Sequence, residues 1–528
     1  MESKRKQTLS RSAKFAESWK SSLSRLRPRP RLGKSSVLKG WTTSQSDRLR
    51  LQLCTSRTSC CGTTRSFPYA KQNVNRLCSG DTMNTATVER GGGDIHRLAT
   101  HKAMLRLLPL MCAIYFLSFI DRTNVALAKT ALATDLGISA SAYGLGAGIF
   151  FLGYALLEVP SNLAAHRVGP RSWIARIAVT WGGLSTAMMF VQGEWSFYTL
   201  RVLLGIAEAG LFPALMYLVT LWFAPKDRAV AVGWIYTAPS IALIVGNPLG
   251  AGLMQLGGVG GLKGWQWMFL LEGLPTIALG MVLFLKLPNR PSEVKWLSAE
   301  EAQALETQAV ADTHGHAELT TSDWLAALKR PTTVLIALIY FLNQVAFVGL
   351  YFFTPSIVAQ MHVKSPLLVG VLSSSVGVGF LLGVLTLPRI HRRVRNDCGL
   401  LGVLTGGVVI SACAFMASRN QTTQIALLAV TGFFAGGILP SYWAVAMKRL
   451  QGVQAAAGLA FINTIGLLGG FVGPYLFGLA ETLTGRSDSG FKFIVGASVL
   501  GLLLIPLLAK AIRAAERPIP GALEASRS

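Results

Sequence analysis

Long apolar stretches dominate the chain from residue 104 onward, and each comes close to the twenty residues that a helix needs to cross a bilayer. They predict twelve transmembrane helices, over residues 104–127, 142–165, 172–192, 196–223, 229–255, 266–288, 332–356, 367–388, 399–417, 422–447, 452–478 and 490–513. The longest polar interval among them, residues 289–331, divides the spans into six and six. This layout predicts two repeated halves with a site between them.

The predicted fold class is therefore an all-α polytopic membrane protein with twelve transmembrane helices arranged as 6+6. The predicted order is a basic extension over residues 1–82, a cytoplasmic leader over 83–103, an N-terminal half over 104–288, a cytoplasmic central loop over 289–331, a C-terminal half over 332–513 and a cytoplasmic tail over 514–528. Nothing in the sequence demands a dimer, so we expect a monomer in the lipid bilayer.

Composition supports this class. Hydrophobic residues make up 51% of the chain and charged residues only 14%, where soluble domains carry about 25%. So few charges cannot cover a soluble surface, which excludes a soluble enzyme, a disordered regulator and a disulfide-built secreted domain. The chain contains neither GxxxxGK[ST] nor HExxH, so we expect no enzyme, no nucleotide-driven pump and no cofactor or metal. The seven cysteines form no CxxC pair and are interpreted as small apolar residues.

The net charge of +25 is concentrated at the start of the chain. Residues 1–82 hold 18 Lys and Arg against 4 Asp and Glu, yet they contain no apolar run that would make a secretory signal. Three interpretations stay open: a true start at Met83, an organellar transit peptide, or a basic disordered tail. This local excess gives no reason to expect a nucleic-acid partner.

Loop charge predicts the orientation. Even-numbered loops carry fifteen Lys and Arg, whereas odd-numbered loops carry six: Lys129, Lys263, Lys364, Arg419, Arg486 and Lys492. By the positive-inside rule the even loops and both termini are cytoplasmic. We expect a plasma membrane location, as in the bacterial inner membrane.

Ionisable residues inside the spans are the informative ones, because each costs about 2.5–3.5 kcal/mol at a helix centre. The first span contains Asp121 and Arg122, the second Glu158, and the fourth Arg201 and Glu208; few other charges are expected to lie deep. Asp121 and Arg122 are neighbours and point about 100° apart on a helix, so they do not form a pair on one face.

An arginine with carboxyls nearby, inside a bundle, is typical of an anion site next to protonatable groups. A guanidinium matches a carboxylate in bidentate fashion. Burial makes a carboxyl hold its proton more tightly, so Asp121 and Glu208 could exchange protons near neutral pH. The alternative is that these charges only hold helices together. For Arg201 the structural and the functional roles are equally open, and for Glu158 the structural role is favoured.

Polar side chains in the spans are further candidates for a wet cavity: Tyr154, Asn343, Gln344 and Asn463. Asn463 stands in an otherwise apolar stretch. Tyr154 could equally be a packing or interfacial aromatic.

Several of these stretches resemble the major facilitator superfamily, specifically its anion:cation symporter family. The resemblance is carried by Phe119-Ile-Asp-Arg-Thr-Asn-Val125, Glu158-Val-Pro-Ser-Asn-Leu163, Arg201-Val-Leu-Leu-Gly-Ile-Ala-Glu-Ala-Gly-Leu-Phe-Pro213, Gly264-Trp-Gln-Trp-Met-Phe-Leu-Leu-Glu-Gly-Leu-Pro275 and Phe461-Ile-Asn-Thr-Ile-Gly466. It covers roughly residues 100–513 and implies proton-coupled uptake of organic anions such as sugar acids, tartrate or aromatic acids.

The resemblance also implies roles for single residues. Asp121 and Glu208 fall on the family's protonatable positions, Arg122 on its substrate-binding arginine, and Tyr154 and Asn463 on cavity positions. Two departures matter: His166 lies near the position of a loop aspartate of the superfamily, and the fifth-span motif is reduced to Gly246-Asn-Pro-Leu-Gly250. The second departure weakens a drug-antiporter interpretation.

The sequence thus predicts a symporter that imports a small carboxylate with protons, binding it through Arg122, Tyr154, Arg201 and Asn463. A proton-independent anion uniporter or exchanger is the first alternative, followed by a drug/proton exporter. A sensor that binds without transporting is a third.

Overall fold

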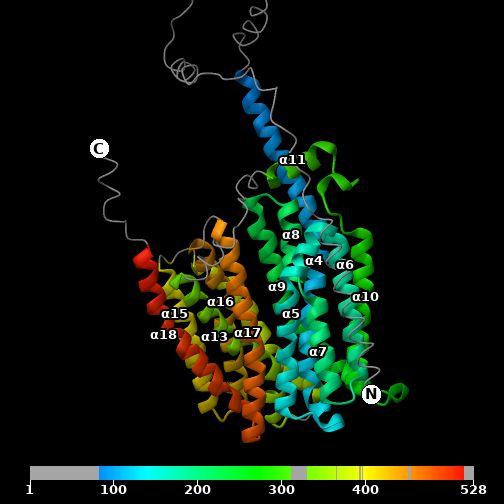
Figure 1. The fold of residues 1–528 in the computed structure, drawn as a ribbon, viewed down its shortest axis with the longest axis vertical. Coiled ribbons are helices and arrows are strands. Elements are labelled where there is room, and N and C mark those ends of the chain that lie inside the picture. The colour runs from blue at the N-terminus through cyan, green and yellow to red at the C-terminus, as the bar shows by residue number, and fades with distance from the viewer. Residues whose placement is uncertain are drawn as a thin grey trace, which may run out of the picture. The chain divides into compact units, whose positions relative to one another are not determined.

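The computed structural model describes residues 82–310, 330–363, 365–391, 394, 396–449 and 453–515 (Figure 1). The extension before residue 82, part of the central loop and the tail from residue 516 lie outside this range. Every regular element in the described residues is helical, in agreement with the predicted class.

Two sets of helices build the molecule. The first comprises α4 (Thr82–Leu136), α5 (Ala140–Val168), α6 (Pro170–Ala187), α7 (Glu194–Glu208), α8 (Leu211–Trp222), α9 (Pro225–Leu253) and α10 (Gly264–Lys286). The second comprises α13 (Pro331–Gln360), α14 (Pro366–His391), α15 (Asp397–Ala417), α16 (Gln421–Arg449), α17 (Val453–Thr484) and α18 (Phe491–Ala515). The short helix α11 (Ala299–Val310) lies between them in sequence.

Short 3₁₀ turns join several helices: Met188–Phe190, Met254–Leu256, Val259–Gly261, Pro291–Glu293 and Ser487–Gly490. Eleven helical segments of the described residues are long and apolar enough to cross a membrane. The third predicted span is α6, which has 18 residues, carries Arg171 and Arg176 and is not among those eleven. With α6 counted, the twelve predicted spans are confirmed.

The fourth span is broken, because α7 ends at Glu208 and α8 begins at Leu211. Gly210 has φ 85°, in the left-handed region, and a Cβ there would lie 2.2 Å from the Ser161 Oγ. The Ser161 hydroxyl donates a hydrogen bond to the freed Ala209 carbonyl at 2.6 Å. A glycine and one serine on α5 therefore fix the place where α7 stops, and so the position of Glu208.

The two halves meet along α5 with α17 and along α9 with α14. Glycines allow this close approach, because a Cβ on Gly144 would lie 2.4 Å from the Pro474 carbonyl oxygen and one on Gly370 would lie 2.5 Å from the Asn247 carbonyl oxygen. Small residues at helix contacts are the usual basis of packing in membranes.

The first helix is longer than the predicted span. The predicted leader (residues 83–103) is helical and continuous with it, and α4 runs on to Leu136. Lys129, counted above as a loop residue, therefore lies inside a helix and is 5% exposed.

The described part of the central loop contains α11, which packs against α4. Lys102 Nζ donates to Glu301 Oε1 at 2.6 Å, and Arg106 lies over the Trp296 ring at 4.6 Å. Ser298 and Glu301 form a reciprocal capping box, since the Ser298 N–H donates to the Glu301 carboxylate and the Glu301 N–H donates to the Ser298 hydroxyl. Lys102 and the Ser298 N–H hold the pKa of Glu301 below its usual range.

A carboxyl with a depressed folded-state pKa adds stability above its unfolded pKa, about 4.3, and loses it as the pH falls through the folded value. We therefore expect α11 to be fully docked at pH 7 and to loosen below about pH 4. Amide hydrogen exchange of residues 299–310 should be faster in Glu301→Gln than in the exposed control Glu300→Gln at pH 7. Equal exchange in both variants would show that the capping box and the Lys102 contact do not hold α11.

Candidate substrate and proton site

The centre of the site is an ion pair within the N-terminal half. Arg122 on α4 donates from Nη2 to Oε1 of Glu208, the last residue of α7, at 2.7 Å. Their side chains are 13% and 2% exposed, so the pair is shielded from water. The Arg122 guanidinium also lies 4.4 Å from the Phe119 ring centroid and 5.2 Å from that of Phe150. A charge-assisted bond and aromatic faces together hold this cation inside the bundle.

Arg201 also lies against Phe150, 4.7 Å from the ring centroid, and is fully buried. Its Nε and Nη2 donate to the carbonyl oxygens of Gly146 and Ala147 on α5 at 3.1 and 3.2 Å. These bonds tie α7 to α5, which is the helix-locking role left open by the sequence. Its Nη1 is not used in them.

Three buried donors at this level have no hydrogen-bond partner among the residues that the structure describes: Arg122 Nε, Arg201 Nη1 and the Tyr351 hydroxyl of α13. Tyr351 comes from the C-terminal half, whereas both arginines come from the N-terminal half. A buried donor without an acceptor is costly. A ligand rich in oxygen acceptors would satisfy donors of this kind.

Asp121 points away from this pair, as its position next to Arg122 requires. Its two carboxylate oxygens accept hydrogen bonds from the Trp181 indole N–H and the Ser185 hydroxyl, both on α6. Asp121 is 3% exposed. The two candidate proton carriers thus lie on different helices, Asp121 on α4 facing α6 and Glu208 at the end of α7, and only Glu208 pairs with Arg122.

Tyr154 lies with the arginines, since its ring centroid is 6.1 Å from that of Phe150 and its side chain is buried. Asn463 is placed differently. Its Nδ2 donates to both carboxylate oxygens of Glu158, at 2.8 and 3.0 Å, and so joins α17 to α5 across the two halves. Asn343 lies inside the C-terminal half, lining a cavity of about 10 Å³ with Thr431 and Phe347.

The expectation that few other charges lie deep missed two residues. Glu272 on α10 is 5% exposed and has Asn124 of α4 as a polar neighbour. The sequence feature that could have identified Glu272 is that it is the single acidic residue in the apolar run from Trp265 to Leu287. Lys129 is the second. The sequence feature that could have identified it is its spacing of seven residues from Arg122, which places both cations on one face of α4.

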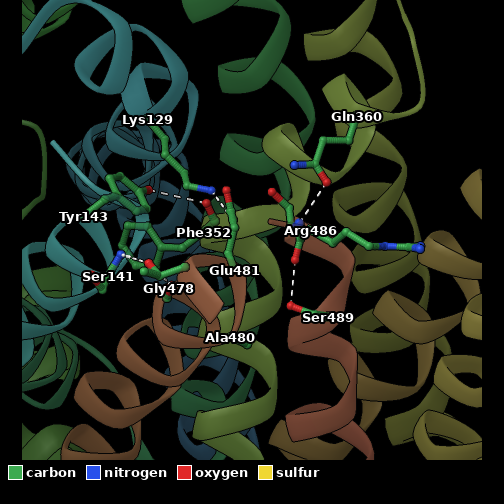
Figure 2. Close-up of polar contacts among 12 residues, drawn as sticks. Lys129, Ser141, Tyr143, Phe352, Gln360, Gly478, Ala480, Glu481, Arg486 and Ser489 are labelled. Atoms are coloured by element: carbon green, nitrogen blue, oxygen red, sulfur yellow. Dashed lines mark hydrogen bonds and ion pairs between the residues drawn. The ribbon is translucent and has the colours of Figure 1, made fainter. Parts of the chain in front are cut away.

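Lys129 forms an ion pair with Glu481 of α17, across the two halves (Figure 2). The side chains are 6% and 15% exposed. The ammonium lies 4.3 Å from the Phe353 ring centroid, and the Tyr143 hydroxyl donates to the Phe352 carbonyl at 3.4 Å. The Ser141 N–H also donates to the Thr482 hydroxyl oxygen at 3.0 Å.

These contacts, which we call the α4/α17 closure (Lys129, Glu481, Ser141 and Thr482), lie at the end of the bundle opposite α11. They involve the last turns of α4 and α17 and the first turn of α5, whereas α11 contacts α4 at Lys102, well before Lys129 along the same helix. Separating the halves at this end requires breaking the Lys129–Glu481 pair.

Comparison with known proteins agrees with this architecture. Residues 111–474 match the Major Facilitator Superfamily profile, and the chain belongs to this family. It is 38% identical to a protein of Acinetobacter baumannii named quinolone resistance transporter, over 78% of this chain and 94% of the other. It is 35% identical to a putative tartrate transporter of Agrobacterium vitis, over 79% and 92%.

A solved structure shares the fold. A bacterial homologue of the human lysosomal transporter Spinster, in an inward-facing and occupied conformation, matches with a TM-score of 0.62 at 17% identity, over 79% of this chain and 98% of that one. The protein is therefore a multi-pass membrane transporter of small molecules with the twelve-helix major facilitator fold, and not an enzyme. The resemblance found in the sequence is confirmed.

The closure gives a direct prediction. Lys129→Glu places two carboxylates together, and removing one partner of a buried pair leaves a charge uncompensated at a cost of about 3–5 kcal/mol. A cysteine placed at Ser141, in protein whose native cysteines are replaced by serine, should then react faster with a membrane-impermeant maleimide than in the parent protein. The double reversal Lys129→Glu with Glu481→Lys should restore protection.

The control is Arg419→Glu, an exposed cation in the loop between α15 and α16 that is not part of the closure. Protection lost equally in the single and the double variants would contradict a specific ion pair, because the double reversal keeps the attraction.

Proposed function

We propose that the protein imports a small organic anion together with protons by alternating access between its two halves. The observation that carries the proposal is the buried Arg122–Glu208 pair, with unpartnered donors on Arg122, Arg201 and Tyr351 around it. An anion bearing a carboxylate supplies both the negative charge and the acceptors that this arrangement lacks.

Proton binding and substrate binding are coupled because Glu208 and the substrate carboxylate compete for the Arg122 guanidinium. While Glu208 is ionised it occupies Arg122, and a substrate carboxylate that bound there would place two anions on one cation. A proton on Glu208 removes its charge and frees Arg122 for the substrate. When Glu208 loses that proton on the other side of the membrane, it pairs with Arg122 again and displaces the substrate.

Asp121 is the proposed second proton carrier. It lies one residue from Arg122 and fixes α4 to α6 through Trp181 and Ser185, so a change in its charge alters the contact that positions Arg122. If both carboxyls carry protons, a monoanion enters with a net charge of +1. Import is then favoured by about 2.3 kcal/mol per 100 mV.

The orientation of the protein in the membrane is inferred from the loop charges. With the even-numbered loops and the α11 end in the cytoplasm, as in a bacterial inner membrane, the α4/α17 closure faces outward. The conformation described here is then closed toward the outside. Tyr351 near the arginines, Glu481 in the closure and Asn463 on Glu158 all belong to the C-terminal half, and their distances from the N-terminal half are expected to change during the cycle.

The names of the relatives point to one shared chemistry. Tartrate and the quinolones both carry carboxylates, so an arginine-centred site suits either class. The relative named for quinolone resistance moves a proton-driven exporter ahead of the exchanger, as the second candidate. A proton-independent exchanger is the third candidate, in which Asp121 and Glu208 are purely structural.

Glu208→Gln tests the coupling residue. Glutamine keeps the shape and one acceptor but cannot ionise, so Arg122 stays available whether or not a proton is present. In proteoliposomes we expect gradient-driven accumulation to be lost, while exchange of labelled for unlabelled substrate persists. Tartrate, galactonate, glucarate, phthalate and 4-hydroxyphenylacetate form the panel of labelled acids.

Asp121→Asn is run beside it and should also lose accumulation. Uptake that ignores the gradient in the parent protein and survives both changes would establish a facilitator or exchanger instead. Extrusion from inside-out vesicles without uptake would support the exporter.

Arg122→Lys tests the fork geometry. Lysine keeps the charge but offers no planar pair of donors, and a bidentate contact contributes roughly 1.5–3 kcal/mol through charged hydrogen bonds. We expect the apparent KM for the transported acid to rise by at least about tenfold, with Arg419→Lys unchanged as the control. An unchanged KM would place the substrate carboxylate elsewhere.

A further inference from the structure

A groove runs between α6 and α10 on the outer side of the N-terminal half. It has a volume of about 520 Å³ and is lined by Ser172, Ala175, Arg176, Val179, Gly280, Met281, Phe284 and Leu285. Four residues come from each helix, at the spacing of a single helix face. The lining is distinct from Arg122, Glu208 and the other residues of the proposed transport site.

The walls of this groove are apolar and open to the surroundings. Val179, Met281, Phe284 and Leu285 are 39%, 55%, 50% and 74% exposed. A Cβ on Gly280 would lie 2.9 Å from Val179 Cγ2, so the two helices touch at the floor of the groove. In a membrane protein such a surface faces hydrocarbon chains, and the groove has the shape to hold one.

One end of the groove is cationic. Arg176 lies over the Trp173 ring at 4.0 Å, and its Nε is buried without a hydrogen-bond partner among the described residues. Arg171 Nε donates to the Phe284 carbonyl at 2.5 Å, which ties α6 to α10 at the mouth. Lys286, the last residue of α10, is exposed beside it. None of the eight lining residues is acidic.

The depth of these cations suits a lipid headgroup. Arg176 is six residues from Pro170, the first residue of α6, which is about 9 Å along the helix. An arginine at this depth on a lipid-facing surface reaches toward the interface and needs an anionic partner there. Arg171 and Arg176 also explain why α6 is the one predicted span that is not strongly apolar.

We propose that this groove is a binding site for an anionic phospholipid of the leaflet on the α11 side. One acyl chain lies between α6 and α10 along Met281 and Phe284, and the phosphate lies against Arg176 with Arg171 and Lys286 near it. Basic pockets between transmembrane helices recognise anionic headgroups in this way. A water-soluble anion would not use the apolar walls, and a zwitterionic lipid would leave the cationic end without charge compensation.

Native mass spectrometry of the full-length protein in detergent tests the proposal. The protein is incubated with dioleoyl phosphatidylglycerol or, separately, with dioleoyl phosphatidylethanolamine. We expect phosphatidylglycerol adducts to exceed phosphatidylethanolamine adducts in the parent protein. Arg176→Gln should lower phosphatidylglycerol occupancy by about fivefold, since one cation near the surface contributes about 1 kcal/mol.

Two further variants separate the site from general attraction to charge. Met281→Trp fills the exposed apolar wall without touching the cations, and should also lower occupancy. Arg419→Gln removes an exposed cation elsewhere and should leave it unchanged. Equal binding of the two lipids, or Arg176→Gln binding that matches the parent, overturns the proposal. The experiment measures lipid binding and not transport, so its result is independent of the outcome of the uptake experiments.

Discussion

A guanidinium buried in the middle of an apolar bundle is the constraint on which the rest of this structure depends. Arg122 stays in place because Glu208 neutralises it and because Phe119 and Phe150 offer it their faces. Glu208 can reach it because α7 stops there, at a break fixed by Gly210 and the Ser161 hydroxyl. A residue on α5 and a turn in the fourth span therefore determine where the charge that pairs with Arg122 is held.

The two ion pairs on α4 play different parts although they share one helix face. Arg122 and Glu208 both belong to the N-terminal half, so their contact can persist whatever the other half does. Lys129 and Glu481 belong to different halves, so their contact exists only while the halves are together at that end. One pair lies within a single half and the other joins the two halves, so only the second must break when the halves separate at that end.

Much of the fold could be predicted from the sequence, because a bilayer imposes its thickness on every span. Twelve spans, their division into halves and the presence of Arg122 and Glu208 inside the spans follow from apolar runs and isolated charges. The sequence does not show which helices face one another. Periodicity shows that Asp121 and Arg122 diverge, but not that Asp121 meets Trp181, that Asn463 meets Glu158, or that Lys129 meets Glu481. Those partners lie 60 to 352 positions away in sequence and are fixed only by packing.

The central claim is that a substrate carboxylate and ionised Glu208 compete for Arg122, so that binding the anion requires a proton. Isothermal titration of the purified protein with its transported acid, in two buffers of different ionisation enthalpy at pH 7, measures the protons taken up per anion bound. The account predicts proton uptake in the parent protein and a smaller uptake in Glu208→Gln with binding retained. Anion binding without any proton uptake in the parent protein would contradict it.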